Sequence, residues 1–257
     1  MLREWRQRRR KSQLALALDA EISTRHLSFI ETGRAQPSRE MVLLLAERLE
    51  VPLRDRNVLL TAAGYAPSFA ARSLDDPSLA SARNAVDWIL RAHEPYPALA
   101  LDAHWNLLAS NQALPPLTAG VDAALLRPPV NVLRLALHPN GLAPRTANLV
   151  EWRAHLLARL QHQIDATADP FLLDLQAELR GYPTPIGAGA ARARAADGEP
   201  EHARVAVPYK LVTERGLLSF MSTTTVFGTP VDITLAELML ESFFPADALT
   251  AEILRGR

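Results

Sequence analysis

The chain contains no cysteine, and this absence excludes two frameworks that stabilise small proteins. Without thiols it can form neither a disulfide scaffold nor a thiolate zinc site, and nothing in it indicates an oxidising compartment. Long apolar runs are lacking too: MVLLLA at 41–46 is far shorter than the ~20 residues that a membrane-spanning helix needs. The basic N-terminus is not followed by the apolar core of a signal peptide. The sequence therefore predicts a soluble protein of the cytoplasm.

An excess of charge of either sign is also absent, because 28 Lys and Arg residues balance 28 Asp and Glu residues among 257. Taken as a single number, this neutrality argues against nucleic acid as a partner. However, residues 1–56 hold 12 basic and 8 acidic residues, which leaves 16 basic and 20 acidic residues for the remainder. This asymmetry favours a polyanion-binding module joined to a second part. A solvated surface is the plain alternative explanation of the basic cluster.

Cap signals and helical spacing divide residues 2–65 into five short helices. Ser12, Ser23 and Ser38 each precede a helical segment and are good N-caps, and Gly33 is placed to end the third helix in the left-handed conformation. Only about three residues separate the second and third helices, so the two should meet at the sharp angle of a helix-turn-helix. These two helices are expected to bury five apolar side chains: Leu14, Ala17, Leu18, Leu27 and Ile30.

The segment SQLALALDAEISTRHLSFIETGRAQPS, at 12–38, resembles the helix-turn-helix of the Xre and Cro/phage-repressor family. In that family the third helix lies in the major groove of double-stranded DNA, where its outward side chains meet base edges. Arg25 would then pair with a guanine, and Phe29 would contact a thymine methyl group. The resemblance also implies a structural ion pair between Glu31 and Arg6. The DNA-binding residues that it implies are Gln13, Thr24, Arg25, His26, Ser28, Phe29, Arg34 and Arg39.

Not all of these residues would contact bases, and some of them have a simpler structural explanation. Gln13 and Arg39, with the basic cluster at 8–11, would contact phosphates rather than bases. The three serines act first of all as helix caps. Phe29 would equally pack against the fourth helix, and His26 would equally be an ordinary surface residue.

After residue 66 the pattern changes. A helix is expected from Pro77 to about His93, and 97–111 alternates in the manner of a two-stranded hairpin. Alternation returns at 205–211, and Gly216 turns the chain into a further strand at 217–227. The stretch 237–244 is compatible with either a strand or a helix. Between these strands, 152–164 and 170–180 are helical in pattern, and the low-complexity stretch 187–198 is expected to be a loop. The apolar stripe of the first helix comprises Leu79, Ala82, Val86, Ile89 and Leu90.

Strands, then helices, then strands is the order of a PAS-like domain. The segments HEPYPALALDAHWNLLASN, NLVEWRAHLLARL and LSFMSTTTVFGTPVDITLAEL are similar to those of the MmyB-like transcription regulators. The predicted fold is mainly α, with two domains. Residues 1–66 form an all-α five-helix lambda-repressor-like helix-turn-helix domain, and 67–95 form a linker and connecting helix. Residues 96–257 form an α+β PAS-like domain with an antiparallel sheet of about five strands.

The same resemblance implies that the second domain senses a small, fatty-acid-like molecule and needs no cofactor. An apolar cavity with a few polar groups would suit such a ligand. For any one residue proposed to line this cavity, an ordinary place in the hydrophobic core is the alternative explanation. Arg134 and Arg153 would equally form internal ion pairs. The candidate ligand-binding residues are Leu101, Trp105, Asn111, Arg134, His138, Trp152, Arg153, Phe220, Met221, Phe227 and Phe243.

No catalytic motif accompanies these features: HExxH, GxSxG, the P-loop and the dinucleotide fingerprint are all absent. His155 and His162 lie two helical turns apart without an evident third metal ligand. We therefore expect no enzyme, but a homodimeric, sequence-specific DNA-binding transcription regulator with a small-molecule effector and no membrane partner, associated with the nucleoid when bound to DNA. The alternative is a constitutive repressor whose second domain serves only dimerisation or protein interaction. A cavity of about 300 Å³ or more would distinguish the two.

Overall fold

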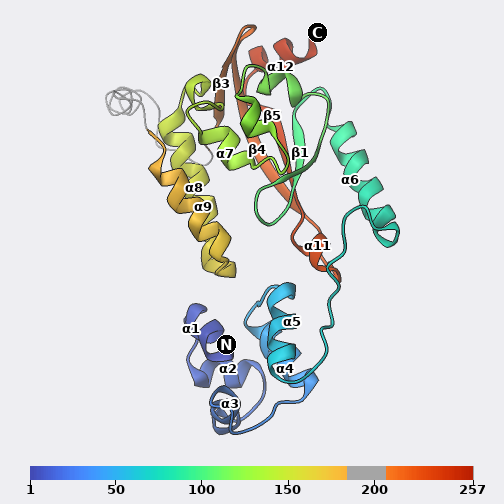
Figure 1. Ribbon diagram of the computed structural model, residues 1–257, viewed down its shortest axis with the longest axis vertical. Coiled ribbons are helices and arrows are strands. Elements are labelled where there is room, and N and C mark those ends of the chain that lie inside the picture. Colours follow the sequence, from blue (N-terminus) through green and yellow to red (C-terminus); the bar gives the residue numbers. More distant parts are fainter. Residues whose placement is uncertain (184–206, 257) are drawn as a thin grey trace. The chain divides into compact units, whose positions relative to one another are not determined.

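The computed structural model describes residues 1–183 and 207–256 (Figure 1). Contacts divide the chain into two compact units, and each has its own apolar core. The N-terminal unit comprises Met1–Asp76 together with Gly228–Ala236, and the C-terminal unit comprises Pro77–Phe227 and Glu237–Arg257. The loop predicted at 187–198 and the beginning of the strand predicted at 205–211 lie outside the described residues.

The N-terminal unit is helical, as predicted. Each of the three predicted serine caps is confirmed, because the hydroxyls of Ser12, Ser23 and Ser38 accept a hydrogen bond from the backbone N–H three residues later. Gly33 ends the third helix with a φ of +72°, in the left-handed region that glycine adopts readily. The five helices predicted for residues 2–65 are α1 (Leu2–Arg8), α2 (Gln13–Asp19), α3 (Thr24–Glu31), α4 (Arg39–Arg48) and α5 (Leu53–Ala62).

The buried face of α2 differs from the predicted one. Leu16 and Ala17 are buried, whereas Leu14 and Leu18 are 60% and 68% exposed, so the prediction was wrong for both leucines. The sequence of α2 alternates Leu and Ala, and a helix of this pattern carries apolar side chains on every face. Packing against α3 and α4, which the local sequence does not reveal, selects the face that becomes buried.

The connection between strands β4 (Gly216–Val226) and β5 (Met239–Pro245) packs within the N-terminal unit, although it lies in the stretch expected to form the second domain. It contains Asp232, which is 2% exposed and accepts a hydrogen bond from Arg72 at 3.1 Å. The next residue, Ile233, begins the short helix α11 (Ile233–Ala236), and its N–H donates to the carbonyl of Ala70 at 2.8 Å. The N-terminal unit therefore includes the turn of a hairpin whose strands belong to the other unit.

The described part of the C-terminal unit contains one five-stranded sheet in the order β2-β1-β5-β4-β3, and every neighbouring pair is antiparallel. This confirms the predicted antiparallel sheet. The stretch 237–244, which was compatible with strand or helix, contributes most of β5. The strands are β1 (Ala98–Leu101), β2 (Leu107–Ser110), β3 (Tyr209–Thr213), β4 (Gly216–Val226) and β5 (Met239–Pro245).

Helices cover both faces of this sheet (Figure 1). On the inner face, α7 (Val132–Leu137), α8 (Leu149–Thr167) and α9 (Pro170–Gly181) enclose the main core of the unit. On the outer face, α6 (Ala80–Ala92) packs Val86 and Leu90 against β1 and β5. Ile89 was expected in the buried stripe of this helix but is exposed. The described residues of the unit also form four short 3₁₀ turns and a C-terminal helix: η1 (Pro77–Leu79), η2 (Pro115–Thr118), η3 (Ala123–Leu126), η4 (Ala143–Arg145) and α12 (Ala248–Arg255).

Candidate functional site

The outer side of α3 presents a compact group of polar and aromatic side chains. Arg25 is exposed, and its guanidinium lies 5.3 Å from the centre of the Phe29 ring, one helical turn further on. This cation–π contact holds Arg25 alongside Phe29 while its N–H groups can still donate to another partner. Thr24, His26 and Ser28 are partly exposed on the same short helix. The face that was predicted to read DNA is therefore accessible.

A hydrogen-bonded network fixes the far end of α3. Arg6 donates from Nε to Glu31 Oε1 at 2.6 Å and from Nη2 to Oε2 at 2.9 Å, which confirms the predicted ion pair. The Gln13 side chain, predicted to meet a phosphate, donates to the same carboxylate at 2.8 Å. Burial alone would raise the pKa of Glu31, but the hydrogen bonds from Arg6 and Gln13 outweigh it, and the pKa is lowered. The network joins α1, α2 and α3 and fixes the orientation of α3.

The other basic side chains around α3 divide into two groups. Arg34 is exposed just beyond α3, and Arg39, at the start of α4, is exposed and donates to the Ser68 hydroxyl at 2.6 Å. In contrast, Arg9 and Lys11 donate to backbone carbonyls at the end of α4, where cations offset the helix dipole. Half of the predicted basic cluster therefore stabilises the fold directly, and Arg8 and Arg10 are exposed.

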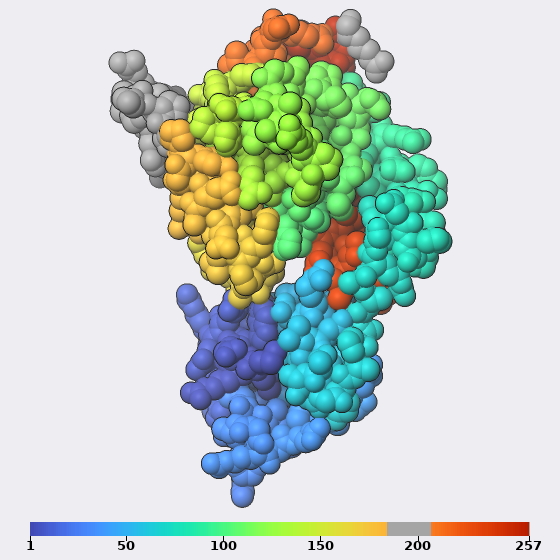
Figure 2. All heavy atoms as spheres, viewed as in Figure 1, coloured from blue at the N-terminus to red at the C-terminus, as the bar shows by residue number. Residues whose placement is uncertain are grey.

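The C-terminal unit contains a partly open apolar cavity of about 90 Å³ between the inner face of its sheet and the helices. The segment between β2 and α8, green in Figure 2, forms much of its wall and lies in the middle of the face of this unit seen there. The cavity volume is smaller than the volume of about 300 Å³ that was expected of a ligand sensor. Five of the predicted ligand-binding residues line it: Leu101, Trp105, Trp152, Phe220 and Phe243.

Trp105 has an unusual backbone conformation for a bulky residue. Its φ is +65°, in the left-handed region, and its side chain is nevertheless buried. The indole N–H donates to Gln163 at 2.7 Å, and the Arg159 guanidinium lies 4.9 Å from the centre of the indole ring. A strained position that directs an aromatic ring into a cavity is typical of a binding site.

The other six predicted ligand-binding residues lie away from the cavity lining. Asn111 is buried but donates to the carbonyls of Leu90 and Tyr96, and so joins α6 to the sheet. Met221 and Phe227 lie on β4 and just after it, and neither lines the cavity. The chemistry of these side chains suggested that they line a pocket. However, the face of the sheet toward which a side chain points depends on strand register, which a single sequence specifies weakly.

The three basic candidates have structural partners. Arg134 pairs with Glu178 at 2.7 Å and lowers the pKa of that carboxyl. Arg153 donates to the last carbonyls of α9 and to that of Tyr182, and the His138 ring lies edge-on to the Tyr182 ring at 5.0 Å. These contacts agree with the alternative that Arg134 and Arg153 serve internal interactions.

Two charged residues that the sequence reasoning missed line the cavity together. Arg159 donates from Nη1 and Nη2 to the two carboxylate oxygens of Glu241, each at 2.8 Å, and Nη2 also donates to the Thr224 hydroxyl. Glu241 is buried on β5, between Met239 and Phe243 on the same face of the strand. Arg159 follows Trp152 and Leu156 on one face of α8, and this helical spacing was the signal available in the sequence.

Tyr209 on β3 is a further lining residue that the sequence reasoning missed. It is 7% exposed, its ring stacks on Trp152 with 4.9 Å between ring centres, and its hydroxyl has no hydrogen-bond partner. Thr146 lies near the phenol, and its own hydroxyl donates to the carbonyl of Leu142 at 2.9 Å. Burial raises the pKa of Tyr209 to about 12, so the hydroxyl keeps its proton at neutral pH.

Two known families match the chain. The Helix-turn-helix family matches residues 2–55, and the family described as the MmyB-like transcription regulator ligand binding domain matches residues 82–256. The chain belongs to the MmyB-like transcription regulators. It is thus a DNA-binding transcription regulator with a ligand-binding domain, and neither family is a family of enzymes. None of the curated proteins compared with this regulator matches it.

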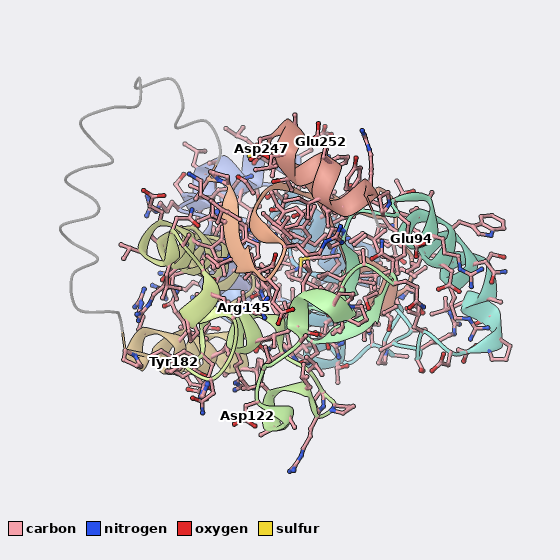
Figure 3. The ribbon with its side chains drawn as sticks, turned by 90° about the horizontal axis from the view of Figure 1, so that it is seen from above. Glu94, Asp122, Arg145, Tyr182, Asp247 and Glu252 are labelled. Carbon is pink, nitrogen blue, oxygen red and sulfur yellow. The ribbon has the colours of Figure 1, made fainter. Side chains whose placement is uncertain are left out.

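A second, open hollow of the regulator's C-terminal unit adjoins the cavity. It is a groove of about 740 Å³ formed by η2, the β3–β4 turn and the end of α12. Arg145 and Glu94, both labelled in Figure 3, are among its polar lining residues. Leu117 lines the groove and the cavity alike, so its side chain forms part of the wall between them.

Other chemistry finds little support in the described part of the regulator. No group of three His, Asp or Glu side chains among residues 1–183 and 207–256 is arranged to hold a metal ion. His155 stacks on Trp152 instead, and burial lowers the pKa of its imidazole. None of the described helices is both long and apolar enough to span a bilayer.

Proposed function

We propose that this MmyB-like regulator binds operator DNA as a homodimer and changes its affinity for DNA when a small, fatty-acid-like molecule occupies the cavity of its ligand-binding domain. The observation that carries the proposal is the combination, in one chain, of an accessible α3 in a helix-turn-helix and an apolar cavity in a matched ligand-binding domain. The protein would act in the cytoplasm, at the nucleoid, by binding rather than by catalysis.

DNA recognition would depend on α3. Arg25 is accessible and can donate two parallel hydrogen bonds to O6 and N7 of a guanine, and Phe29 beside it can contact a thymine methyl group. Thr24, His26 and Ser28 would lie against neighbouring bases, and Gln13, Arg34 and Arg39 would contact phosphates. One chain offers one such helix, so two chains would occupy half-sites roughly 34 to 36 Å apart.

The size of the cavity sets the conditions for ligand binding. At about 90 Å³ it admits only part of a fatty-acid-like molecule. Because Leu117 separates it from the groove, a rotation of that side chain would join the two spaces and accommodate a longer chain. If no ligand binds, the small cavity favours a constitutive DNA-binding repressor whose C-terminal domain serves dimerisation or protein interaction.

Strands β4 and β5 provide a route from the ligand to the DNA-binding unit. Glu241 and Thr224, which contact Arg159 at the cavity, lie on these two strands. The strands are joined by the segment that packs in the N-terminal unit through Asp232 and Arg72. A ligand that alters the pairing at Arg159 would change the geometry of this hairpin, and unequal binding to the two states would shift DNA affinity.

The test begins with selection of bound DNA from random sequence by the full-length protein, and with native mass spectrometry to find a co-purifying small molecule. The affinity for the selected operator is then measured by fluorescence anisotropy with and without the extracted molecule. A several-fold change in affinity would support ligand-responsive regulation. An unchanged affinity, or a protein that carries and binds no small molecule, would favour the constitutive alternative.

Asp232→Asn tests the route, because it removes the charge that pairs with Arg72 and keeps the size of the side chain. We expect D232N to bind operator and extracted molecule as the wild type does, but to lose most of the ligand-induced change in operator affinity. Asp174→Asn, at an exposed position of α9, is the matched control. A full ligand response in D232N would exclude this route.

A further inference from the structure

We infer that two copies of the regulator associate through strand β4. Residues 221–226, which we name the edge segment, would pair antiparallel with the edge segment of a second copy about a two-fold axis at Thr224. The inference rests on the homodimer of the proposed function and names the surface through which it forms.

The edge segment is paired on one side only. Strand β3 pairs with Gly216–Phe220, whereas β4 continues past β3 to Val226 (Figure 1). From residue 221 onward the partner of β4 is β5 alone. Val207 and Pro208, the described residues that precede β3, do not continue its ladder. Within the described part of the chain, the other side of the edge segment is therefore open.

The backbone groups that face this open side follow from the alternation of a strand. Both polar backbone groups of Ser219 point away from β3, because its carbonyl accepts from the Ala246 N–H at 2.8 Å and its N–H donates to the Thr250 hydroxyl at 2.9 Å. Every second residue of a strand directs its N–H and C=O to the same side. The register between β4 and β5 contains no shift, so the alternation continues along β4. The residues that direct these groups to the open side are Ser222, Thr224 and Val226.

The open side also lacks the features that normally protect a sheet edge. Proteins protect such edges with charged side chains, proline or a β-bulge, because free N–H and C=O groups invite pairing with another strand. The edge segment, MSTTTV, contains no charged residue and no proline, and it pairs with β5 without a bulge. Its residues 223–226 are all exposed. The nearest charges, those of Arg159 and Glu241, are paired with each other.

A second copy of this chain fits the open side because the segment is complementary to itself. With a two-fold axis at Thr224, the N–H and C=O groups of Ser222 would pair with those of Val226 in the other copy, and Thr224 would pair with Thr224. Each of the outward-facing groups would thus have a partner. Threonines opposite one another stabilise a sheet, and a neutral segment brings no like charges together. Such a two-fold interface is closed, so it leaves no further copy to be added at this edge.

The register allows a test by charge. Thr223 and Thr225 are exposed, and each would lie opposite the other across the axis. The variant Thr223→Lys with Thr225→Lys would place lysine opposite lysine, whereas the matched variant Thr223→Lys with Thr225→Glu would place lysine opposite glutamate. Sedimentation velocity of the full-length protein over a range of concentrations gives the dissociation constant of the dimer. We expect the Lys/Lys variant to raise this constant by at least roughly tenfold, and the Lys/Glu variant to remain within about threefold of the wild type.

Hydrogen exchange of the full-length protein provides the second measurement. The amides of Ser222 and Thr224 should exchange several-fold more slowly in the dimer than in the monomer. A Lys/Lys variant that dimerises as the wild type does, or edge amides that exchange equally in both states, would overturn the inference and leave the proposed homodimer intact. A wild-type protein that stays monomeric would contradict the homodimer, and the inference with it.

Discussion

Arg159 on α8 and Glu241 on β5 are joined by two parallel hydrogen bonds of 2.8 Å at the wall of the apolar cavity. The pair connects helix α8, which covers the sheet, with β5, which is the central strand of the sheet and one strand of the hairpin β4–β5. The turn of this hairpin packs in the N-terminal unit, which also contains α3, so the route proposed above from the ligand to the DNA runs along this hairpin.

Breaking this ion pair should destabilise the protein strongly. Arg159→Met leaves the buried carboxylate of Glu241 without a partner and is expected to lower the free energy of unfolding by about 3 kcal/mol. The double variant Arg159→Met with Glu241→Leu should be more stable than the single one, because it removes both charges. Arg134→Met, which breaks the more exposed pair with Glu178, should cost only about 0 to 1 kcal/mol. Urea unfolding measures all three; equal stability of the single and the double variant would refute the prediction.

Removing the unpartnered phenol should stabilise the ligand-free protein. Tyr209→Phe keeps the ring and its stacking but deletes the unsatisfied hydroxyl, so the free energy of unfolding should rise by about 1 kcal/mol. Scanning calorimetry would then show Tm higher by roughly 2 to 4 °C. Tyr182→Phe is the control: its hydroxyl donates to Glu178, so Tm should fall or stay unchanged. A lower Tm in Y209F would show that this hydroxyl has a stabilising partner in the ligand-free protein.

The ion-pair network at the end of α3 predicts a pH dependence of stability. The pKa of Glu31 is lowered in the folded protein, so its contribution is complete above the ordinary value of about 4.3 and is lost as the pH falls through the lower folded value. The wild type should therefore lose stability in this acidic range more steeply than Glu31→Gln. Urea unfolding at a series of pH values measures the slopes, with the exposed Glu47→Gln as the control. Parallel slopes for the wild type and E31Q would contradict the role given to Glu31.

Two arginines near α3 should differ in their effect on DNA binding. Arg25→Ala should cost roughly 1 to 3 kcal/mol at the selected operator and relax the base preference at one position. Arg39→Ala should weaken binding to all sequences alike and lower the salt slope by about one. Anisotropy titrations with operator variants at several salt concentrations separate the two. If R25A keeps both affinity and base preference, the assignment of the reading face is incorrect.

Features determined by neighbouring residues could be predicted from the sequence. The serine caps and the glycine after α3 depend on local chemistry, and both are present. The stretch read as alternating does form β1, but all four of its residues are buried. The face of α2 could not be predicted, because Leu14 and Leu16 differ only in what packs against them. The contact between Arg159 and Glu241 spans 82 positions and depends on the register of β5, and the packing of Asp232 against Arg72 spans 160. Such long-range contacts decide which side chains line the cavity, and for that reason six of the predicted ligand-binding residues lie elsewhere.

The most direct test of ligand-responsive DNA binding is the dissociation constant of the full-length protein for its selected operator, measured with and without a saturating amount of the molecule extracted from it. Coupling free energies between two sites are typically about 1 to 3 kcal/mol, which corresponds to a change in affinity of roughly fivefold to 150-fold. We predict a change within this range, and a smaller one in D232N. The same dissociation constant in both conditions would contradict the account.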